Sequence, residues 1–247
     1  MRVLLSLLLL ALSGCARFQP LTTPIGQIHY HTALALPVSQ RQLVVLLPGI
    51  SGWPGDYARH GLVDDIQRLY PSADVVSVNA HFGYYRSRQL LARLQQDVIA
   101  PALEQGYCAV HLAGISLGGF GGLLYLREFP DQLASVSLLA PYLGEPADYG
   151  YLLNEGEQAQ PASIAGLWPW LTALDDNTAG KIYLAWGRDD AFDPANSLLA
   201  AYLPAGHAYR GEGNHRWPTW QRLWRNGLEH RQLLPIYRDR CVAINAN

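Results

Sequence analysis

The chain has 247 residues, of which 49% are hydrophobic and 15% are charged, with 23 Gly and 16 Pro. This composition is too apolar for a disordered polypeptide, and the glycine and proline contents are below those of low-complexity chains. The 18 Lys and Arg residues against 20 Asp and Glu residues give a net charge of -2. No basic excess therefore favours nucleic acid as a partner. The length fits one domain or two small ones.

The first residues predict a secretory signal. Met1 and Arg2 are followed by the apolar run Val3–Leu12 and then by small residues. This order is typical of signal peptides. The run is too short to span a hydrocarbon core, which needs about 20 apolar residues.

The sequence Leu12-Ser13-Gly14-Cys15 also resembles the lipobox of bacterial lipoproteins. The resemblance implies a signal peptide over residues 1–14 and lipidation of Cys15. The following residues are not the aspartate that retains many lipoproteins at the inner membrane. The implied location is therefore the cell envelope, lipid-anchored at the outer membrane and facing the periplasm. An ordinary signal peptide with a chance cysteine is the alternative.

Two further cysteines, Cys108 and Cys241, have two possible states. They could form a disulfide in an oxidising periplasm. Alternatively, Cys108 is buried at the start of a strand and Cys241 is free. Pairing depends on their Cα separation, which sequence does not give.

After an N-terminal anchor segment with the first strands (15–42), residues 43–247 read as one domain. Apolar, β-branched runs alternate with amphipathic segments, which predicts a mostly parallel sheet covered by helices on both faces. The predicted strands are Leu43–Leu47, Asp74–Val78, Ala109–Ala113, Ser135–Ala140, Lys181–Trp186 and Ala205–Arg210. The predicted helices are Tyr57–Tyr70, Ser87–Gln105, Leu117–Phe129, Pro194–Tyr202 and Trp217–Leu233.

One segment, about 141–180, is long for a connection between strands. A structureless loop of this length is uncommon in a compact domain, and a functional lid is a usual explanation. Trp168 and Trp170 in this segment either line a substrate entrance or anchor the lid to the core.

The strongest chemical signal is Gly114-x-Ser116-x-Gly118. It follows an apolar strand and opens a Gly-rich helix, which is the context of a nucleophile elbow. The small flanking residues let strand and helix approach closely. We therefore expect Ser116 to be a nucleophile at the carboxyl edge of the sheet.

A serine nucleophile needs a base, and the base needs an orienting carboxylate. Candidate acids follow the fifth of these strands at Asp189, Asp190 and Asp193, where Asp193 could instead cap the next helix. His215 lies in a Gly-rich loop after the last strand. The rival histidines are His207, expected inside a strand, and His230, expected late in a helix.

In this order, the three motifs resemble the α/β-hydrolase superfamily over roughly residues 43–233. The resemblance implies Ser116 as nucleophile and His215 as general base and then acid. The family pattern Gly-x-x-Asp-x-x-x-Pro favours Asp190 as the triad acid over its two neighbours. The implied reaction is hydrolysis of a carboxylic ester through an acyl-enzyme.

The oxyanion hole in this family combines two backbone N–H groups. They correspond to Leu117 and Ile50 in this chain. Many relatives have His-Gly before the second donor, whereas this chain has Pro48-Gly49. The Ser51 hydroxyl is a candidate supplement.

Other site expectations rest on weaker patterns. His81, Tyr84 and neighbouring aromatic residues follow a strand and either line the substrate pocket or pack under the lid. Together with Ser51, Trp168 and Trp170 they are the weak pocket candidates. His29 and His31 have the spacing of metal ligands but no nearby Cys, Asp or Glu, so no metal is expected.

The fold and triad leave several reactions open. Thioesterase, lysophospholipase, peptidase and acyltransferase chemistry would use the same residues. A catalytically inactive binding lipoprotein is the alternative from another class. We expect a small ester or acyl substrate, attachment to a membrane through lipid, no cofactor and no nucleic acid.

Overall fold

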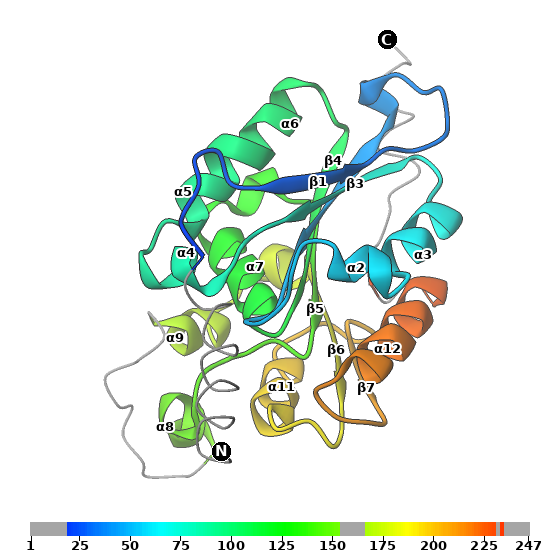
Figure 1. The fold of residues 1–247 in the computed structure, drawn as a ribbon. Helices are drawn as coiled ribbons and strands as arrows, with labels where there is room; N and C mark the ends of the chain where they lie inside the picture. Colours follow the sequence, from blue (N-terminus) through cyan, green and yellow to red (C-terminus); the bar gives the residue numbers. More distant parts are fainter. Residues whose placement is uncertain (1–18, 154–165, 231–232, 235–247) are drawn as a thin grey trace, which may run out of the picture.

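The computed structural model describes residues 19–153, 166–230 and 233–234. In these residues a 7-stranded sheet has the order β1-β3-β2-β4-β5-β6-β7 (Figure 1). The strands are β1 (Gln27–Tyr30), β2 (Gln42–Leu47), β3 (Ala73–Val78), β4 (Ala109–Ile115), β5 (Ser135–Leu139), β6 (Ile182–Gly187) and β7 (Ala208–Gly211). β1 pairs antiparallel with β3, and the other neighbours are parallel. The predicted fold class is confirmed.

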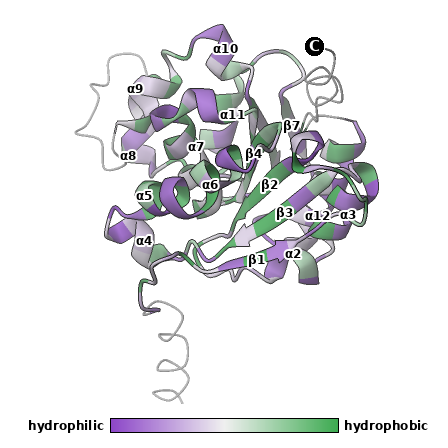
Figure 2. Cartoon of the chain, turned by 90° about the horizontal axis from the view of Figure 1, so that it is seen from above, coloured by the Kyte–Doolittle hydropathy of each residue, from purple (hydrophilic) through white to green (hydrophobic). Residues whose placement is uncertain are grey.

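Helices cover both faces of this sheet (Figure 2). On one side, α2, α3 and α12 pack together, and the helices from α4 to α7 lie on the other side with α9 and α11. The α-helices are α2 (Asp56–Arg59), α3 (Leu62–Leu69), α4 (Phe82–Arg86), α5 (Leu90–Leu94), α6 (Ala100–Glu104), α7 (Leu117–Glu128), α8 (Pro146–Tyr149), α9 (Leu167–Leu171), α10 (Asp176–Ala179), α11 (Asp193–Ala200) and α12 (Trp217–Glu229).

The two hydrophobic cores follow from the alternation of side chains along the strands. Leu43, Val45 and Leu47 of β2 face one core, and Val44 and Leu46 face the other. Successive residues of a strand point to opposite faces, so a strand buried on both faces is expected to be mainly apolar. This is why the central strands were readable as continuous apolar runs.

Two predicted helices differ from the structure. The segment Tyr57–Tyr70 contains two helices, α2 and α3, because Gly61 between them has a φ of 76°. The left-handed conformation interrupts the helix, and glycine adopts it without steric cost. The predicted helix Ser87–Gln105 begins only at Leu90 and contains a π-helical segment, Gln95–Ile99.

A proline, Pro101, follows that π-helical segment. Pro101 has no N–H to donate to the carbonyl oxygen of Asp97 four residues earlier. The Gln27 side-chain amide, from β1, donates to this carbonyl oxygen instead, at 3.0 Å. The Asp97 carboxylate also accepts a hydrogen bond from the Ile25 N–H at 2.8 Å. The irregular turn thus ties the helix to the antiparallel edge strand.

Short 3-10 helices occur at Val38–Gln40, Pro130–Gln132 and Gly150–Leu152. The predicted strand Ala205–Arg210 starts three residues late, at Ala208, because residues 205–207 form a turn. Beyond α12, the Leu234 N–H donates to the buried Ser137 Oγ at 3.0 Å. The chain therefore returns to the middle of the sheet after its last described helix.

Candidate active site

Ser116 lies at a sharp turn between β4 and α7. Its backbone has a φ of 54° and a ψ of -116°, a strained conformation for a residue with a side chain. Two backbone hydrogen bonds hold it there. The Ser116 N–H donates to Leu139 O and the Tyr142 N–H donates to Ser116 O, both at 3.0 Å. The end of β5 and the chain just after it therefore fix the turn.

The two motif glycines are required by close backbone contacts. A Cβ on Gly114 would lie 2.3 Å from the Gly118 backbone, and a Cβ on Gly118 would lie 2.0 Å from Leu47 O. Neither distance is tolerable for a carbon atom. The small residues around Ser116 thus allow β4, α7 and the end of β2 to meet, as the sequence motif predicted.

Asp190 and His215 meet at the same edge of the sheet. Asp190 follows β6, His215 follows β7, and His215 Nδ1 lies 2.8 Å from Asp190 Oδ2. The Asp190 side chain is fully buried, and its Oδ1 accepts a hydrogen bond from the Phe192 N–H at 2.9 Å. The carboxylate is therefore fixed by its own loop while it holds the imidazole.

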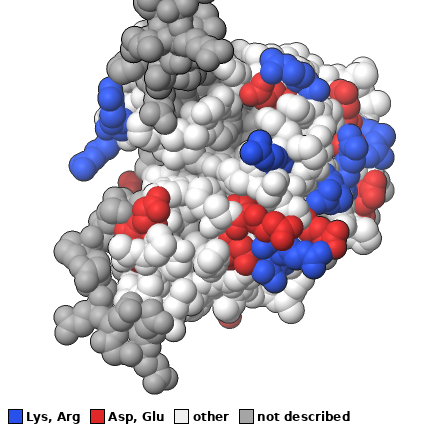
Figure 3. Space-filling model, turned by 60° about the horizontal axis from the view of Figure 1, so that its bottom comes forward, with Lys and Arg blue, Asp and Glu red and all other residues white. Residues whose placement is uncertain are grey.

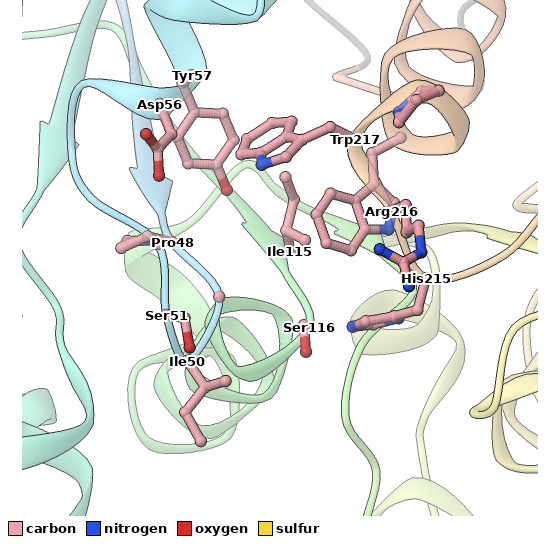
Figure 4. Close-up of a pocket in the computed structure, with 14 residues that line it drawn as sticks. Pro48, Ile50, Ser51, Asp56, Tyr57, Ile115, Ser116, His215, Arg216 and Trp217 are labelled. Carbon is pink, nitrogen blue, oxygen red and sulfur yellow. The ribbon is translucent and has the colours of Figure 1, made fainter. Parts of the chain in front are cut away.

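His215 and Ser116 face one another across one cavity. Both line it, and the imidazole nitrogen points toward the Ser116 hydroxyl (Figure 4). Since Nδ1 is engaged with Asp190, Nε2 is the nitrogen available to the serine. The structure thus brings together the three residues Ser116, Asp190 and His215.

The rival acids have other partners. The Asp193 carboxylate accepts two hydrogen bonds from the Arg210 guanidinium and one from Trp186 Nε1, all at 2.7 Å. Arg210 lowers the pKa of Asp193 below its usual value. The expectation that Asp193 caps α11 is wrong, because Phe192 occupies the N-cap and no side chain caps the helix. Asp189 accepts a hydrogen bond from the Gly213 N–H at 3.2 Å.

Neither rival histidine is among the residues that line the cavity with Ser116. His207 precedes β7 and is not inside a strand, contrary to expectation, because β7 begins one residue later. Its Nδ1 lies 3.0 Å from Ile182 O, and its ring stacks on Tyr183. His230 is the C-cap of α12 and lies 2.9 Å from Asn226 O through Nδ1.

Two aromatic rings flank the His215 imidazole, and sequence reasoning missed both. Phe192 and Trp220 contact it edge to face, with ring centroids 4.7 and 5.0 Å away. Phe192 comes two residues after Asp190, and Trp220 lies in the first turns of α12. Their closeness in sequence to the predicted acid and base could have identified them as residues of the site. These rings restrict the orientation of the imidazole.

The cavity has a volume of about 480 Å³ and is mostly apolar. Its lining comes from the loop after β2, the start of α2, the end of β4, and the loop before α12 with the start of that helix: Pro48, Gly49, Ile50, Ser51, Gly52, Asp56, Tyr57, Ile115, Ser116, His215, Arg216, Trp217, Pro218 and Trp220. The Gly52 N–H donates to Gly49 O at 2.9 Å, closing a turn around Ile50 and Ser51. Both predicted residues of this loop therefore line the cavity.

The Leu117 N–H begins α7 beside the serine. As the first helical residue, Leu117 has no carbonyl acceptor within its own helix. Such N–H groups at a helix start favour negative charge. Leu117 thus begins α7 directly after the serine, and Ile50 lines the cavity in the turn after β2.

Four weak pocket candidates do not line this cavity. Tyr84 is fully buried, and its hydroxyl lies 2.9 Å from the Thr22 N–H, which donates to it. His81 caps α4 by accepting from the Gly83 N–H at 3.1 Å, and burial lowers its pKa. The short helix α4 directs both side chains toward the segment before β1. Of the two alternatives given for them, pocket lining or packing, the structure shows both residues buried and neither in the cavity lining.

Trp168 and Trp170 also belong to the core. Trp168 is buried and donates through Nε1 to Leu143 O at 2.8 Å, and Trp170 packs against the same core. Residues 154–165 lie outside the described residues. The described parts of 141–180 contribute nothing to the cavity lining, so the lid stays a prediction.

Several predictions about the N-terminus and the cysteines concern residues outside the described ranges. The predicted signal peptide and Cys15 lie in residues 1–18, which are not described. Cys108 is disulfide-bonded, and Cys241 lies outside the described residues, so its pairing with Cys108 stays a prediction. Within the described ranges, no helix combines the length and apolarity needed to cross a membrane.

A mostly parallel sheet with a strained serine after β4, an acid after β6 and a histidine after β7 is the arrangement of the α/β-hydrolases. Residues 64–228, about two thirds of the chain, match the Esterase family, described as "Putative esterase". The chain belongs to this family and is an α/β-hydrolase enzyme. The match includes Ser116, Asp190 and His215 but not the loop around Ile50.

Solved structures of hydrolases share this fold. A ferulic acid esterase has a TM-score of 0.60 and 16% identity, over 84% of this chain and 91% of that chain. S-formylglutathione hydrolase from Staphylococcus aureus has a TM-score of 0.56 and 15% identity, over 84% and 96%. Enterobactin esterase from Shigella flexneri has a TM-score of 0.59 and 16% identity, over 85% and 56%. No curated protein sequence matches this chain.

Proposed function

We propose that the protein is a serine hydrolase that cleaves carboxylic esters through a Ser116–His215–Asp190 triad. The observation that carries the proposal is the His215 imidazole, held by a buried carboxylate on one side and facing Ser116 on the other. A histidine oriented in this way can remove the serine proton and later return it to the leaving group.

In the proposed mechanism, Ser116 Oγ attacks the ester carbonyl carbon while His215 Nε2 accepts the hydroxyl proton. Asp190 holds the ring in the tautomer with hydrogen on Nδ1 and stabilises the imidazolium that forms. The N–H groups of Leu117 and Ile50 bind the oxyanion of the tetrahedral intermediate. Such donors typically contribute about 10²–10³ to turnover each.

Collapse of the intermediate breaks the ester bond, and His215 protonates the departing alkoxide. The acyl group remains on Ser116. A water molecule then attacks the acyl carbon as His215 accepts its proton. Return of that proton to Ser116 Oγ releases the carboxylic acid and restores the enzyme.

The test is labelling with a fluorophosphonate probe together with hydrolysis of 4-nitrophenyl butanoate. We expect the wild-type protein to be labelled and active, and Ser116→Ala to lose labelling and a factor on the order of 10⁴ or more in kcat. Ser39→Ala is the matched control, because Ser39 is exposed and outside the cavity. A folded wild-type protein that is neither labelled nor active would refute the proposal.

A second comparison separates ester hydrolysis from related reactions. The butanoyl group is offered as an aryl ester, a thioester and an anilide, with a small alcohol added as an alternative acceptor to water. We expect the oxygen ester to have the highest kcat/KM. A preference for the thioester, the anilide or transfer to the alcohol would reassign the reaction while retaining the triad.

A further inference from the structure

The cavity contains one cationic side chain, that of Arg216, among its described lining residues. Arg216 directly follows His215 and forms the N-cap of α12. Figure 4 shows its side chain beside the His215 imidazole, across the cavity from Ile50 and Ser51. A charged group in this place lies within the reach of a substrate bound at Ser116.

The backbone of Arg216 is firmly placed. The Arg216 N–H donates to Asn214 O at 2.8 Å, and Arg216 O accepts from the Thr219 and Trp220 N–H groups at 3.0 and 3.1 Å. The start of the guanidinium arm is therefore fixed relative to the imidazole. The arm itself is exposed to solvent.

The Arg216 guanidinium has no hydrogen-bond or ion-pair partner within the described ranges. By contrast, Asp56, the acidic lining residue, is engaged and largely buried: it accepts from the Trp53 N–H at 2.8 Å and pairs with Arg59 at 2.6 Å. The acidic charge in the lining is therefore neutralised locally, whereas the basic charge is available to a ligand.

Most of the remaining wall is uncharged. The rings of Tyr57, Trp217 and Trp220 and the side chains of Ile50 and Ile115 line it. Figure 3 shows a hollow of uncharged surface at this end of the molecule, with basic and acidic side chains beside it. Next to apolar walls, a guanidinium binds an anion more strongly than in open water, because fewer waters compete for it.

We propose that Arg216 selects esters that carry a negatively charged group, a carboxylate being the simplest, together with an apolar or aromatic body. This inference rests on the proposed ester hydrolysis at Ser116. The planar guanidinium can donate two parallel hydrogen bonds to a carboxylate. The aromatic walls bind the apolar part, and the anion sets its orientation relative to the serine.

The test uses two pairs of esters, one charged on the acyl side and one on the alcohol side. The first pair is the 4-nitrophenyl monoester of adipic acid and 4-nitrophenyl 6-methylheptanoate, in which an isopropyl group replaces the carboxylate. The second is 4-carboxyphenyl and 4-carbamoylphenyl butanoate. The readout is the ratio of kcat/KM for the anionic ester to that for its neutral partner, compared between enzymes so that intrinsic reactivity cancels.

We expect Arg216→Gln to lower this ratio about 10-fold in at least one pair, as for a charge-assisted hydrogen bond at a partly exposed site. Arg216→Lys should retain part of the ratio, and added salt should lower it in the wild-type enzyme. Arg86→Gln is the matched control, because Arg86 is exposed on α4 outside the cavity. Ratios that stay within twofold in both pairs overturn the inference and leave ester hydrolysis intact.

A binding measurement keeps the two proposals separable. Benzoate and benzamide are titrated while tryptophan fluorescence is recorded, because Trp217 and Trp220 line the cavity and contribute to this signal. We expect Arg216→Gln to weaken benzoate about 10-fold relative to benzamide. If none of the four esters is hydrolysed, the proposed function fails. The role of Arg216 is then decided by the ratio of the affinities for benzoate and benzamide in the wild-type and Arg216→Gln proteins. An unchanged affinity ratio would then refute it.

Discussion

We expect the free energy of unfolding to decrease in mild acid because of His111. Replacing His111 should make this decrease smaller. His111 lies in the middle of β4, the strand that leads to Ser116, and it is fully buried. Its Nδ1 lies 2.7 Å from Ser135 Oγ and its Nε2 lies 2.9 Å from Gln42 Oε1. The ring thus joins β4 to both neighbouring strands in its neutral form.

Burial lowers the pKa of His111 from 6.5 to about 4. At pH 7 the ring is neutral in the folded chain and mostly neutral in the unfolded chain. Below pH 6.5 the unfolded chain binds a proton that the folded protein does not, so the free energy of unfolding decreases as pH falls. The loss is complete near pH 4, and 1.36 kcal/mol per unit of pKa difference gives about 3 kcal/mol.

The assay is urea unfolding followed by tryptophan fluorescence and far-UV circular dichroism, from pH 7.5 to pH 4.5. We expect His111→Gln to be less stable than wild type at pH 7.5 but to lose about 2 kcal/mol less over this range. Burial also lowers the pKa of His29 and His81. These two histidines lower the free energy of unfolding in acid equally in the wild-type and variant proteins. The difference in pH dependence between the two proteins therefore reports on His111 alone.

Equal pH dependence in the two proteins would refute this reasoning. If His111→Gln does not fold, nuclear magnetic resonance of the wild-type ring provides the decision. A His111 ring that remains neutral at pH 5 agrees with the prediction. Protonation of the folded ring near pH 6.5 contradicts it.

Two further predictions concern the active-site loops and the serine turn. Asp190→Asn should lower kcat for 4-nitrophenyl butanoate by a factor on the order of 10³–10⁴, because the amide no longer holds the required imidazole tautomer. Asp193→Asn is the matched control and should keep kcat within a few-fold. It should cost about 1 kcal/mol of unfolding free energy, because it weakens the ion pair with an exposed arginine. Equal losses of kcat in the two variants would contradict the assignment of Asp190 as the triad acid. Gly118→Ala should lower the unfolding free energy by about 3 kcal/mol in urea titrations, because its Cβ would lie 2.0 Å from a carbonyl oxygen of β2. Gly55→Ala has nothing within 4 Å of its Cβ and should be near neutral, so similar losses in the two variants would contradict the steric argument.

The fold was largely readable from sequence because burial on both faces leaves a strong pattern. β2 to β6 are mainly apolar, and their observed ends fall within about two residues of the predicted ones. β1 is short, half exposed and antiparallel, so it has no such pattern. The five-residue helix α4 is too short to show helical periodicity.

The positions of Ser116, Asp190 and His215 were predictable because each follows a readable strand. Their meeting follows from topology, since the carboxyl ends of neighbouring parallel strands share one edge of the sheet. Topology does not determine where a side chain in the loop after a strand points. By the same edge argument, His81 and Tyr84 were expected either to line the pocket or to pack under the lid, yet they face the N-terminal segment.

The residues that sequence reasoning missed depend on contacts between loops. Phe192 and Trp220 reach His215 from two elements that are separate in the chain. Neither has a periodicity that distinguishes it from an ordinary packed aromatic residue. Arg216 was likewise missed. An arginine next to a histidine in the sequence indicates a binding role only when the residues of the cavity wall are known.

The edge position of β7 bears on how the molecule loses activity. β7 has four residues, none of them fully buried, and within the described structure it pairs only with β6. Edge elements with few buried contacts open at a lower free energy than the centre of a domain. His215 comes after β7, whereas Ser116 is joined to the central strand β4. Local opening of this edge would therefore remove the base while the nucleophile and most of the sheet stay folded, so inactivation and global unfolding are physically distinct events.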